Sequence, residues 1–265
     1  MKYQYSIFIA LMLLVASCAE NPEEFGIGTI CNIPIEIAST YPTPVSTRAS
    51  MENGFVADDA VGVFVVDYDK EGNPGLPDLK GERAGNIKFT YDGERWAANY
   101  QLYWKPATTP ADFYGYYPYD QQMESVIDYG FSVKRSQDGN TEGTDNTKGY
   151  IESDLLWAKA TKVMPTSEAV SLQYKHLMAG ITITLEQGTG FTAEEWTALD
   201  KTVQIESTIL GGTADLSTGS VTVGNGSPTS ITPLYHNGTY RAVVFPQTVS
   251  AGKSIASVTI DGQSY

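Results

Sequence analysis

The chain has 265 residues, of which 42% are hydrophobic, and it carries a formal net charge of −14. This length and apolar content suffice for two modest globular domains and exclude an extensively disordered chain. The acidic balance without a visible basic patch excludes a nucleic-acid-binding surface, and two cysteines exclude a disulfide framework.

The first 18 residues have the pattern of a lipoprotein signal peptide. A positively charged start precedes an apolar run over residues 7–15, and small residues lead into Cys18. The run is too short to cross a bilayer and is typical of a cleaved secretory signal. We therefore expect Cys18 to carry a lipid, the alternative being an ordinary signal cut elsewhere. Acidic residues at 20, 23 and 24 resemble the surface-export signal of Bacteroidota lipoproteins and favour the outer face of the outer membrane.

Residues 19–48 form a leader that contains one candidate strand. Cys31, Ile33, Ile35 and Ile37 are spaced by two, so a strand would place all four side chains on one face. Pro34 lies on the opposite face and lacks a ladder donor, which favours an edge position. Burial of three isoleucines contributes about 5–9 kcal/mol, comparable with the total stability of a small domain. Such a strand would need a hydrophobic groove and could be removed from it.

A proline-containing linker follows, over residues 41–50, and its sequence favours an extended, protease-accessible conformation. Arg48 is the only arginine or lysine between Lys2 and Lys70. An arginine-specific protease that cut between Arg48 and Ala49 would separate the leader from the body at a single place. The alternative is that Arg48 is an ordinary linker residue.

The body of the chain is predicted to be all-β, because short β-branched and aromatic runs alternate with Gly, Asn, Asp and Pro. We expect a helix near residues 192–199, where Thr192 and Glu195 have capping-box spacing. Asn237-Gly238 and Asp261-Gly262 favour two-residue hairpin turns. We place two domains at residues 49–198 and 199–265. The clearest predicted strands cover residues 61–66, 100–104, 170–176, 181–185, 203–205, 221–223, 240–245 and 257–260.

The last predicted hairpin stops three residues after its turn, so the second domain is expected to be incomplete. Either the chain is a fragment, or another chain supplies the missing strand, since an unpaired apolar edge invites strand addition.

Aromatic side chains gather between residues 96 and 119. Alternation would turn Tyr100, Leu102 and Trp104 inward, and Tyr103 and part of 114–117 outward. Core packing explains most of these rings. The alternative is an exposed platform of Trp96, Tyr103 and Trp104 that stacks sugar rings.

Other polar residues do not favour catalysis or metal binding. His176 shares a face with apolar neighbours and is expected to be a hydrogen-bonded core histidine, whereas His236 precedes a turn and is expected to be exposed. The acidic pairs 58–59 and 67–69 lack the spacing of a calcium loop and favour solvated turns. We expect no enzymatic activity, no metal and no cofactor.

Four further stretches carry a family resemblance. They are TRA before AVGVF at 60–64, DFYGYYP at 112–118, DLLWA at 154–158 and LQYKHLMAGITI at 172–183. With the lipobox and leader, their order resembles the fimbrillin family of Bacteroidota, the subunits of type V pili. The resemblance implies two transthyretin-like β-sandwich domains, a lipidated precursor, cleavage after an arginine and polymerisation by strand exchange. It would make Cys18 the lipid site, Arg48 the processing site and 33–37 part of the displaced strand.

The resulting hypothesis is a structural and adhesive pilus subunit, located at the outer membrane and then in the fimbrium. Its partners would be other pilus subunits, an arginine-specific protease and the outer membrane, through the lipid anchor. The alternative is a surface glycan-binding lipoprotein that stays anchored through Cys18 and does not polymerise.

Overall fold

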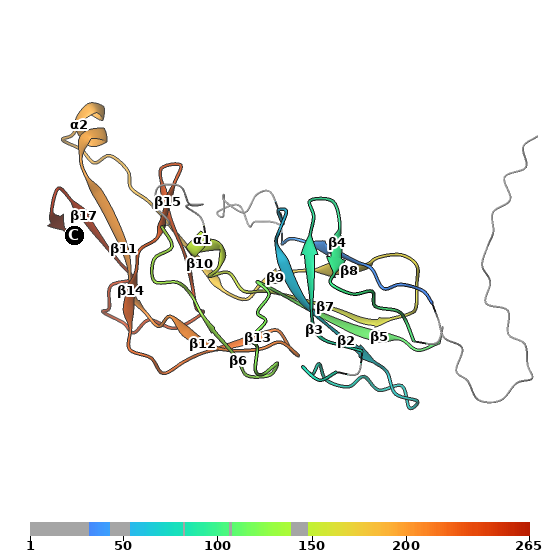
Figure 1. Ribbon diagram of the computed structural model, residues 1–265. Coiled ribbons are helices and arrows are strands. Elements are labelled where there is room, and N and C mark those ends of the chain that lie inside the picture. The colour runs from blue at the N-terminus through green and yellow to red at the C-terminus, as the bar shows by residue number, and fades with distance from the viewer. Residues whose placement is uncertain (1–31, 43–53, 82, 106–107, 139–147) are drawn as a thin grey trace, which may run out of the picture.

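The computed structural model describes residues 32–42, 54–81, 83–105, 108–138 and 148–265, and it confirms the all-β fold class. The described molecule is elongated, with β1 to β5 toward one end and residues 201–265 toward the other (Figure 1). The elements of the first part are β1 (Ile37–Thr40), β2 (Ala60–Asp67), β3 (Ala84–Tyr91), β4 (Trp96–Ala98), β5 (Ala111–Tyr117), β6 (Tyr129–Ser132), α1 (Lys148–Ile151), β7 (Leu156–Val163), β8 (Val170–Gln173) and β9 (Lys175–His176).

The chain continues through one more helix and nine further strands. These are β10 (Ala179–Thr184), α2 (Ala193–Ala198), β11 (Lys201–Thr208), β12 (Gly211–Asp215), β13 (Ser220–Val223), β14 (Thr229–Ile231), β15 (Leu234–His236), β16 (Thr239–Val244), β17 (Ala256–Ile260) and β18 (Gln263–Ser264). Most predicted strands are present, but residues 100–104 form only an isolated bridge at Tyr103.

A six-stranded antiparallel sheet, in the order β4-β3-β2-β5-β7-β9, is the central wall of the molecule. Every residue of β5 is buried. Phe113 and Tyr117 pack into one apolar cluster, while Tyr114 and Tyr116 pack into another. Because neighbouring side chains on a strand point to opposite faces, this sheet separates two cores. The prediction that some of residues 114–117 face solvent is therefore wrong, since both faces of β5 are covered.

The first core lies on the face of this sheet that contacts β1 and β8. Its buried members are Ile35, Ile37, Val61, Val63, Val65, Ala84, Ile87, Phe89, Trp96, Leu102, Trp104, Ala111, Phe113, Tyr117, Leu156, Ala158, Val170, Leu172 and Tyr174. The second core begins on the opposite face and extends through residues 203–245.

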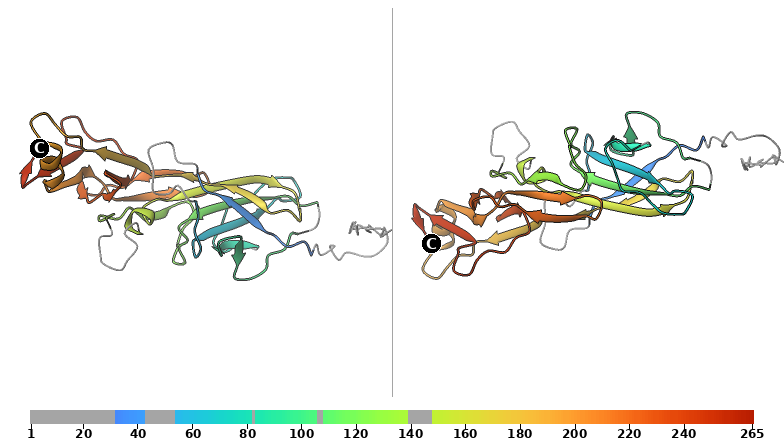
Figure 2. Two further views of the ribbon diagram at one scale, coloured as in Figure 1. Left: turned by 90° about the horizontal axis from the view of Figure 1, so that it is seen from above. Right: turned by 90° about the horizontal axis from the view of Figure 1, so that it is seen from below.

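Three further sheets surround the second core. Their strand orders are β10-β16-β15, β14-β11-β17-β18 and β13-β12-β6. Both β6 and β10 precede residue 199, yet they pair with β12 and β16, which follow it. Strand pairing therefore does not follow a division between residues 198 and 199, and Figure 2 shows the continuous elongated arrangement from two sides.

Local sequence signals determine the turns and α2 as expected. Asn237 and Gly238 have φ of 48° and 79°, and Asp261 and Gly262 have φ of 46° and 81°. These positive values are what a type I′ hairpin turn requires at its two central positions. Helix α2 begins with the predicted capping box, in which Thr192 and Glu195 bond each other's backbone N–H.

The final hairpin gives β17 a partner on both edges. On one edge β17 pairs with β11, and on the other it pairs with the two-residue strand β18. Tyr265 and Val258 also exchange two backbone hydrogen bonds, with N–O distances of 2.8 and 3.3 Å.

Candidate functional site

The leader segment from Ile33 to Tyr41 lies between two other parts of the chain. Its first residues run antiparallel to residues 102–104, where Ile35 N donates to Leu102 O at 2.8 Å and Trp104 N donates to Ile33 O at 3.0 Å. Strand β1 then runs parallel to β8, with Ile37 opposite Val170. The leader is thus bonded on one side to 102–104 and on the other to β8. We call this position the leader groove.

The isoleucines of the leader point into the first core. Ile35 and Ile37 are 3% and 5% exposed, and Ile33 is half-buried. Glu36 and Ala38, between and after them, are exposed. This is the alternation that the spacing by two predicts. Cys31, the fourth member of the pattern, lies outside the described residues.

Pro34 fits its position in the leader without loss of a hydrogen bond. It lies opposite Tyr103 in an antiparallel bridge. The backbone bonds on either side are made by Ile33 and Ile35, so the bridge is a non-hydrogen-bonded pair. The missing N–H of Pro34 would point away from 102–104, to a side on which no described residue pairs with the leader at this position, so Pro34 lies at a local edge as the sequence predicts.

An aromatic contact joins the end of the leader to the start of the body. The ring of Tyr41 is 5.1 Å from that of Phe55 and 5.9 Å from that of His176, both in edge-to-face geometry. Gly54 also lies against Tyr41, since a Cβ at Gly54 would be 3.7 Å from the Cβ of Tyr41. The two ends of the 43–53 segment are therefore close together. That segment contains Arg48 and Ala49, which lie outside the described residues, as does Cys18.

Phe55 extends this contact into the first core. Its ring makes edge-to-face contacts with Trp96, Tyr117 and Tyr174, at centroid distances of 5.0, 5.5 and 5.4 Å. Such pairs contribute beyond the area they bury. The signal for this contact was present in the sequence, because Tyr41 continues the inward period of Ile33, Ile35 and Ile37. Tyr41 was not assigned to the core because residues 41–50 were interpreted as a linker.

Beneath the leader, polar groups are paired or kept neutral. His176 Nδ1 is 2.6 Å from Asp154 Oδ2, so His176 is hydrogen-bonded as predicted. Burial raises the pKa of Tyr174 and of Tyr117, and the nearby Asp59 carboxylate adds to the shift at Tyr117. Gly115 leaves room for Tyr174, because a Cβ there would lie 2.4 Å from the Tyr174 hydroxyl oxygen.

A cavity of about 320 Å³ follows the leader on the side of β4. Its lining includes Ile35, Glu36 and Ile37 from the leader, together with Asp92 and Arg95 from the turn before β4. The leader groove is therefore open to solvent along part of its length.

The predicted aromatic platform is not formed. Trp96 and Trp104 are 9% and 3% exposed, and Trp104 Nε1 donates to Thr166 O at 3.0 Å. Only Tyr103, of the three platform residues, is exposed, at 50%. Tyr100, expected to point inward, is 48% exposed because residues 100–104 do not form a regular strand. The prediction of a platform of Trp96, Tyr103 and Trp104 is therefore wrong, because both indole rings are buried in the first core.

The remaining polar candidates have structural partners. Asp59 accepts from Val56 N and from the Tyr117 hydroxyl, and Asp67 forms ion pairs with Arg83 and Lys105 at 2.6 and 2.8 Å. His236, expected to be exposed, is half-buried. Within the described ranges, no group of three or more His, Cys, Asp or Glu side chains is placed to hold a metal ion.

One buried polar residue, Gln137, was not identified from the sequence. The Gln137 side chain is fully buried, accepts from Val243 N at 2.7 Å and donates to Val243 O at 2.7 Å. It thereby continues the edge of β16 beyond its last pair with β15, Leu234 with Arg241. No sequence signal separates this glutamine from the polar residues that surround it in the sequence.

In the part of the chain that the structure describes, no helix has the length and apolar character to cross a membrane.

Comparison with known proteins places the chain in a family. The model of the fimbrillin-like family matches residues 47–265. Among solved structures, the chain is similar to proposed cell adhesion proteins from Bacteroides uniformis (21% identity, 88% of this chain and 82% of that chain covered, TM-score 0.61) and Bacteroides ovatus (18%, 88% and 84%, TM-score 0.64). It is also similar to a fimbrial protein from Bacteroides vulgatus (11%, 88% and 86%, TM-score 0.52). No curated protein matches. The family match over residues 47–265, together with the shared all-β fold, shows that this chain belongs to the fimbrillin-like family.

Proposed function

We propose that the chain is a structural and adhesive subunit of a type V pilus, made as a lipoprotein precursor and assembled by strand exchange. One observation carries the proposal: Ile33 to Tyr41 complete the first core from the N-terminal side of Arg48. A cut at Arg48 would therefore leave a core-forming strand without a covalent link to the body.

The energetics favour exchange of the leader rather than simple loss. Removal of the leader would expose the first core beside Ile35 and Ile37, at a cost of about 1.5–3 kcal/mol for each isoleucine. It would also leave backbone groups of 102–104 and β8 without partners. An extended segment of a neighbouring subunit would restore both the hydrogen bonds and the apolar contacts.

Cleavage and release are separate steps in this proposal. The aromatic contact of Tyr41 with Phe55 and His176, and the bonds along β1, do not depend on the 43–53 segment. The cut leader would stay bound until a neighbouring strand displaced it. The cavity beside Ile35 to Ile37 gives that strand access to the groove.

The proposal assigns three partners and a location. Cys18 would attach the precursor to the outer membrane through lipid, an arginine-specific protease would cut between Arg48 and Ala49, and other pilus subunits would supply and receive strands. The family to which the chain belongs and the fimbrial protein with a similar fold support a cell-surface location.

An arginine-specific protease tests the processing step. Arg48→Lys keeps the charge but removes the cut site, and Arg135→Lys is the matched control at an arginine that the structure shows to be exposed. After protease treatment, the parent and the Arg135→Lys variant should form polymers visible by electron microscopy. Arg48→Lys should remain monomeric, and polymerisation of this variant to the same extent would contradict the proposed cut.

A reducible disulfide between the leader and β8 tests the exchange step. Ala38 lies opposite Ser171 in the register of β1 and β8, and both side chains are exposed. The variant Ala38→Cys/Ser171→Cys, with Cys31→Ser, should be cut normally but should polymerise only after a reductant opens the disulfide. Polymers formed by the oxidised, cross-linked variant would show that the leader need not leave.

A further inference from the structure

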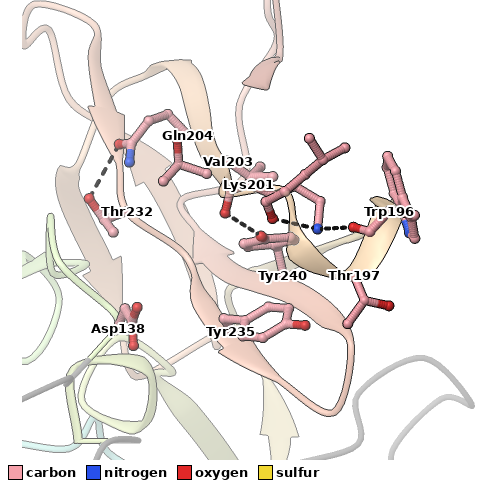
Figure 3. Close-up of a pocket in the computed structure, with 11 residues that line it drawn as sticks. Asp138, Trp196, Thr197, Lys201, Val203, Gln204, Thr232, Tyr235 and Tyr240 are labelled. Atoms are coloured by element: carbon pink, nitrogen blue, oxygen red, sulfur yellow. Dashed lines mark hydrogen bonds between the residues drawn. The ribbon is translucent and has the colours of Figure 1, made fainter. Parts of the chain in front are cut away.

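A second recess lies far from the leader groove, between α2 and strands β11, β15 and β16 (Figure 3). Its volume is about 500 Å³. Its lining includes the aromatic rings of Trp196, Tyr235 and Tyr240 and the polar side chains of Asp138, Gln204 and Thr232. This mixture is typical of small-ligand sites, where apolar surface supplies affinity and a few polar groups fix orientation.

The base of the recess is a fixed pair of tyrosine rings. Tyr235 is 53% exposed, and its ring packs on Tyr240 at a centroid distance of 4.7 Å and an interplanar angle of 41°. The Tyr240 hydroxyl donates to Lys201 O at 2.8 Å. Tyr240 is thereby held in place and supports one side of Tyr235, whose exposed surface faces the recess (Figure 3).

Helix α2 forms one wall of the same recess, and hydrogen bonds hold both of its ends. Its first turn is held by the capping box of Thr192 and Glu195. At its other end, Lys201 Nζ donates to Trp196 O and Leu199 O at 2.6 and 2.7 Å and lies 4.9 Å from the centre of the Trp196 ring. A positive group at the last carbonyls of a helix stabilises that end. The recess therefore exists before any ligand binds, which lowers the entropy cost of binding.

The polar groups around the tyrosines have free hydrogen-bonding capacity. No described residue donates a hydrogen bond to the Asp138 carboxylate, and its partial burial raises its pKa. Gln204 uses its oxygen to accept from the Thr232 hydroxyl at 3.3 Å, and its amide NH₂ has no partner among the described residues. A carboxylate acceptor and an amide donor on the same lining can bond separate hydroxyl groups of one ligand (Figure 3).

We propose that this recess is a binding site for a neutral saccharide, with the Tyr235 ring under one face of the sugar and Asp138 and Gln204 bonded to its hydroxyls. A sugar ring presents a C–H face, which packs on the negative face of an aromatic ring. Among the described lining residues the only cation is Lys201, and its ammonium is already bonded to two carbonyls. The site therefore lacks a cation for an acidic sugar. A proline-rich peptide would use the rings but not the carboxylate.

Ligand-observed NMR tests the site on the purified protein, with lactose, maltose and cellobiose as neutral probes. 3′-Sialyllactose and a proline-rich decapeptide are the comparison probes. At least one neutral probe should bind the parent. Tyr235→Ala, and separately Asp138→Leu, should weaken its Kd at least about tenfold. Tyr103→Ala, which removes an equally exposed tyrosine at 50% exposure, is the matched control and should leave the Kd within about twofold.

Three outcomes would overturn the site. They are no binding of any neutral probe at millimolar concentration, equal binding by the Tyr235→Ala variant, or stronger binding of the acidic sugar or the peptide than of every neutral probe. The proposed pilus function is tested separately, since Tyr235→Ala should still polymerise after protease treatment. Loss of sugar binding with normal polymers supports this site whatever the fate of the leader.

Discussion

The two cores of this protein share one sheet but are closed in different ways. The first core is completed by Ile33 to Tyr41, a segment that is joined to the body only through residues 43–53. The second core combines β6 and β10 with the hairpins β12–β13, β15–β16 and β17–β18, and Ala256 and Val258 of the last hairpin pack at its margin. A single cut in 43–53 would therefore separate a segment with two buried isoleucines from the first core, whereas the last described segment, residues 256–265, contains no buried residue. Whether a strand can be replaced by another therefore depends on how it is connected along the chain as well as on how well it packs.

The largest expected effect on stability comes from truncation of the leader's buried isoleucines in the uncut protein. Ile35→Ala/Ile37→Ala should destabilise the first core by about 2–5 kcal/mol for each buried isoleucine. Urea unfolding followed separately at Trp104, in the first core, and at Trp196, on α2, should show the first transition shift alone. Glu36→Ala, at the exposed position between them, should shift neither transition by more than about 0.5 kcal/mol. Equal shifts at both tryptophans would mean that the cores do not differ in this way.

The next effect belongs to the second core. Gln137→Ala would leave the N–H and C=O of Val243 buried without partners, at a cost of about 1–3 kcal/mol for each group. The transition reported by Trp196 should move to lower urea, while that of Trp104 should not. Gln122→Ala, at an exposed glutamine, is the control. A shift confined to Trp104 would reverse the assignment of Gln137 to the second core.

The smallest effect is local to α2. Thr192→Ala removes the hydroxyl that accepts from Glu195 N and should cost about 1 kcal/mol of helix stability, seen as roughly fivefold faster amide exchange at Glu195. Hydrogen bonds from Thr192 also lower the pKa of Glu195. The capping contribution of Glu195 is therefore present above the ordinary glutamate pKa and is lost as pH falls through the lowered value. Exchange in the first core should not respond to either change.

Short-range patterns in the sequence predicted much of this structure. The period of two at Ile33, Ile35 and Ile37 identified the face that enters the first core, and the Asn-Gly and Asp-Gly pairs identified two turns. The capping-box spacing located α2. For the turns and the helix cap the decisive interaction lies within a few residues, and for the leader the geometry of a strand alone determines which side chains share a face.

The failures concern residues whose environment depends on distant segments. Trp104 is buried because Thr166 and the leader lie over it, and Tyr114 and Tyr116 are buried because the second core covers the far face of β5. The recess beside α2 likewise combines Asp138 with residues that lie some sixty and a hundred positions further along. Alternation along one strand cannot say whether both faces of a sheet are covered. The order of strands in space was therefore the missing information.

The contact between Tyr41 and Phe55 has a consequence for when assembly would occur. Because the contact joins residues on either side of the 43–53 segment, the proposed cut in that segment would not by itself release the leader. The rate of filament growth would then depend on encounters between neighbouring subunits on the cell surface. The protease would set only the number of cleaved subunits that are able to exchange strands.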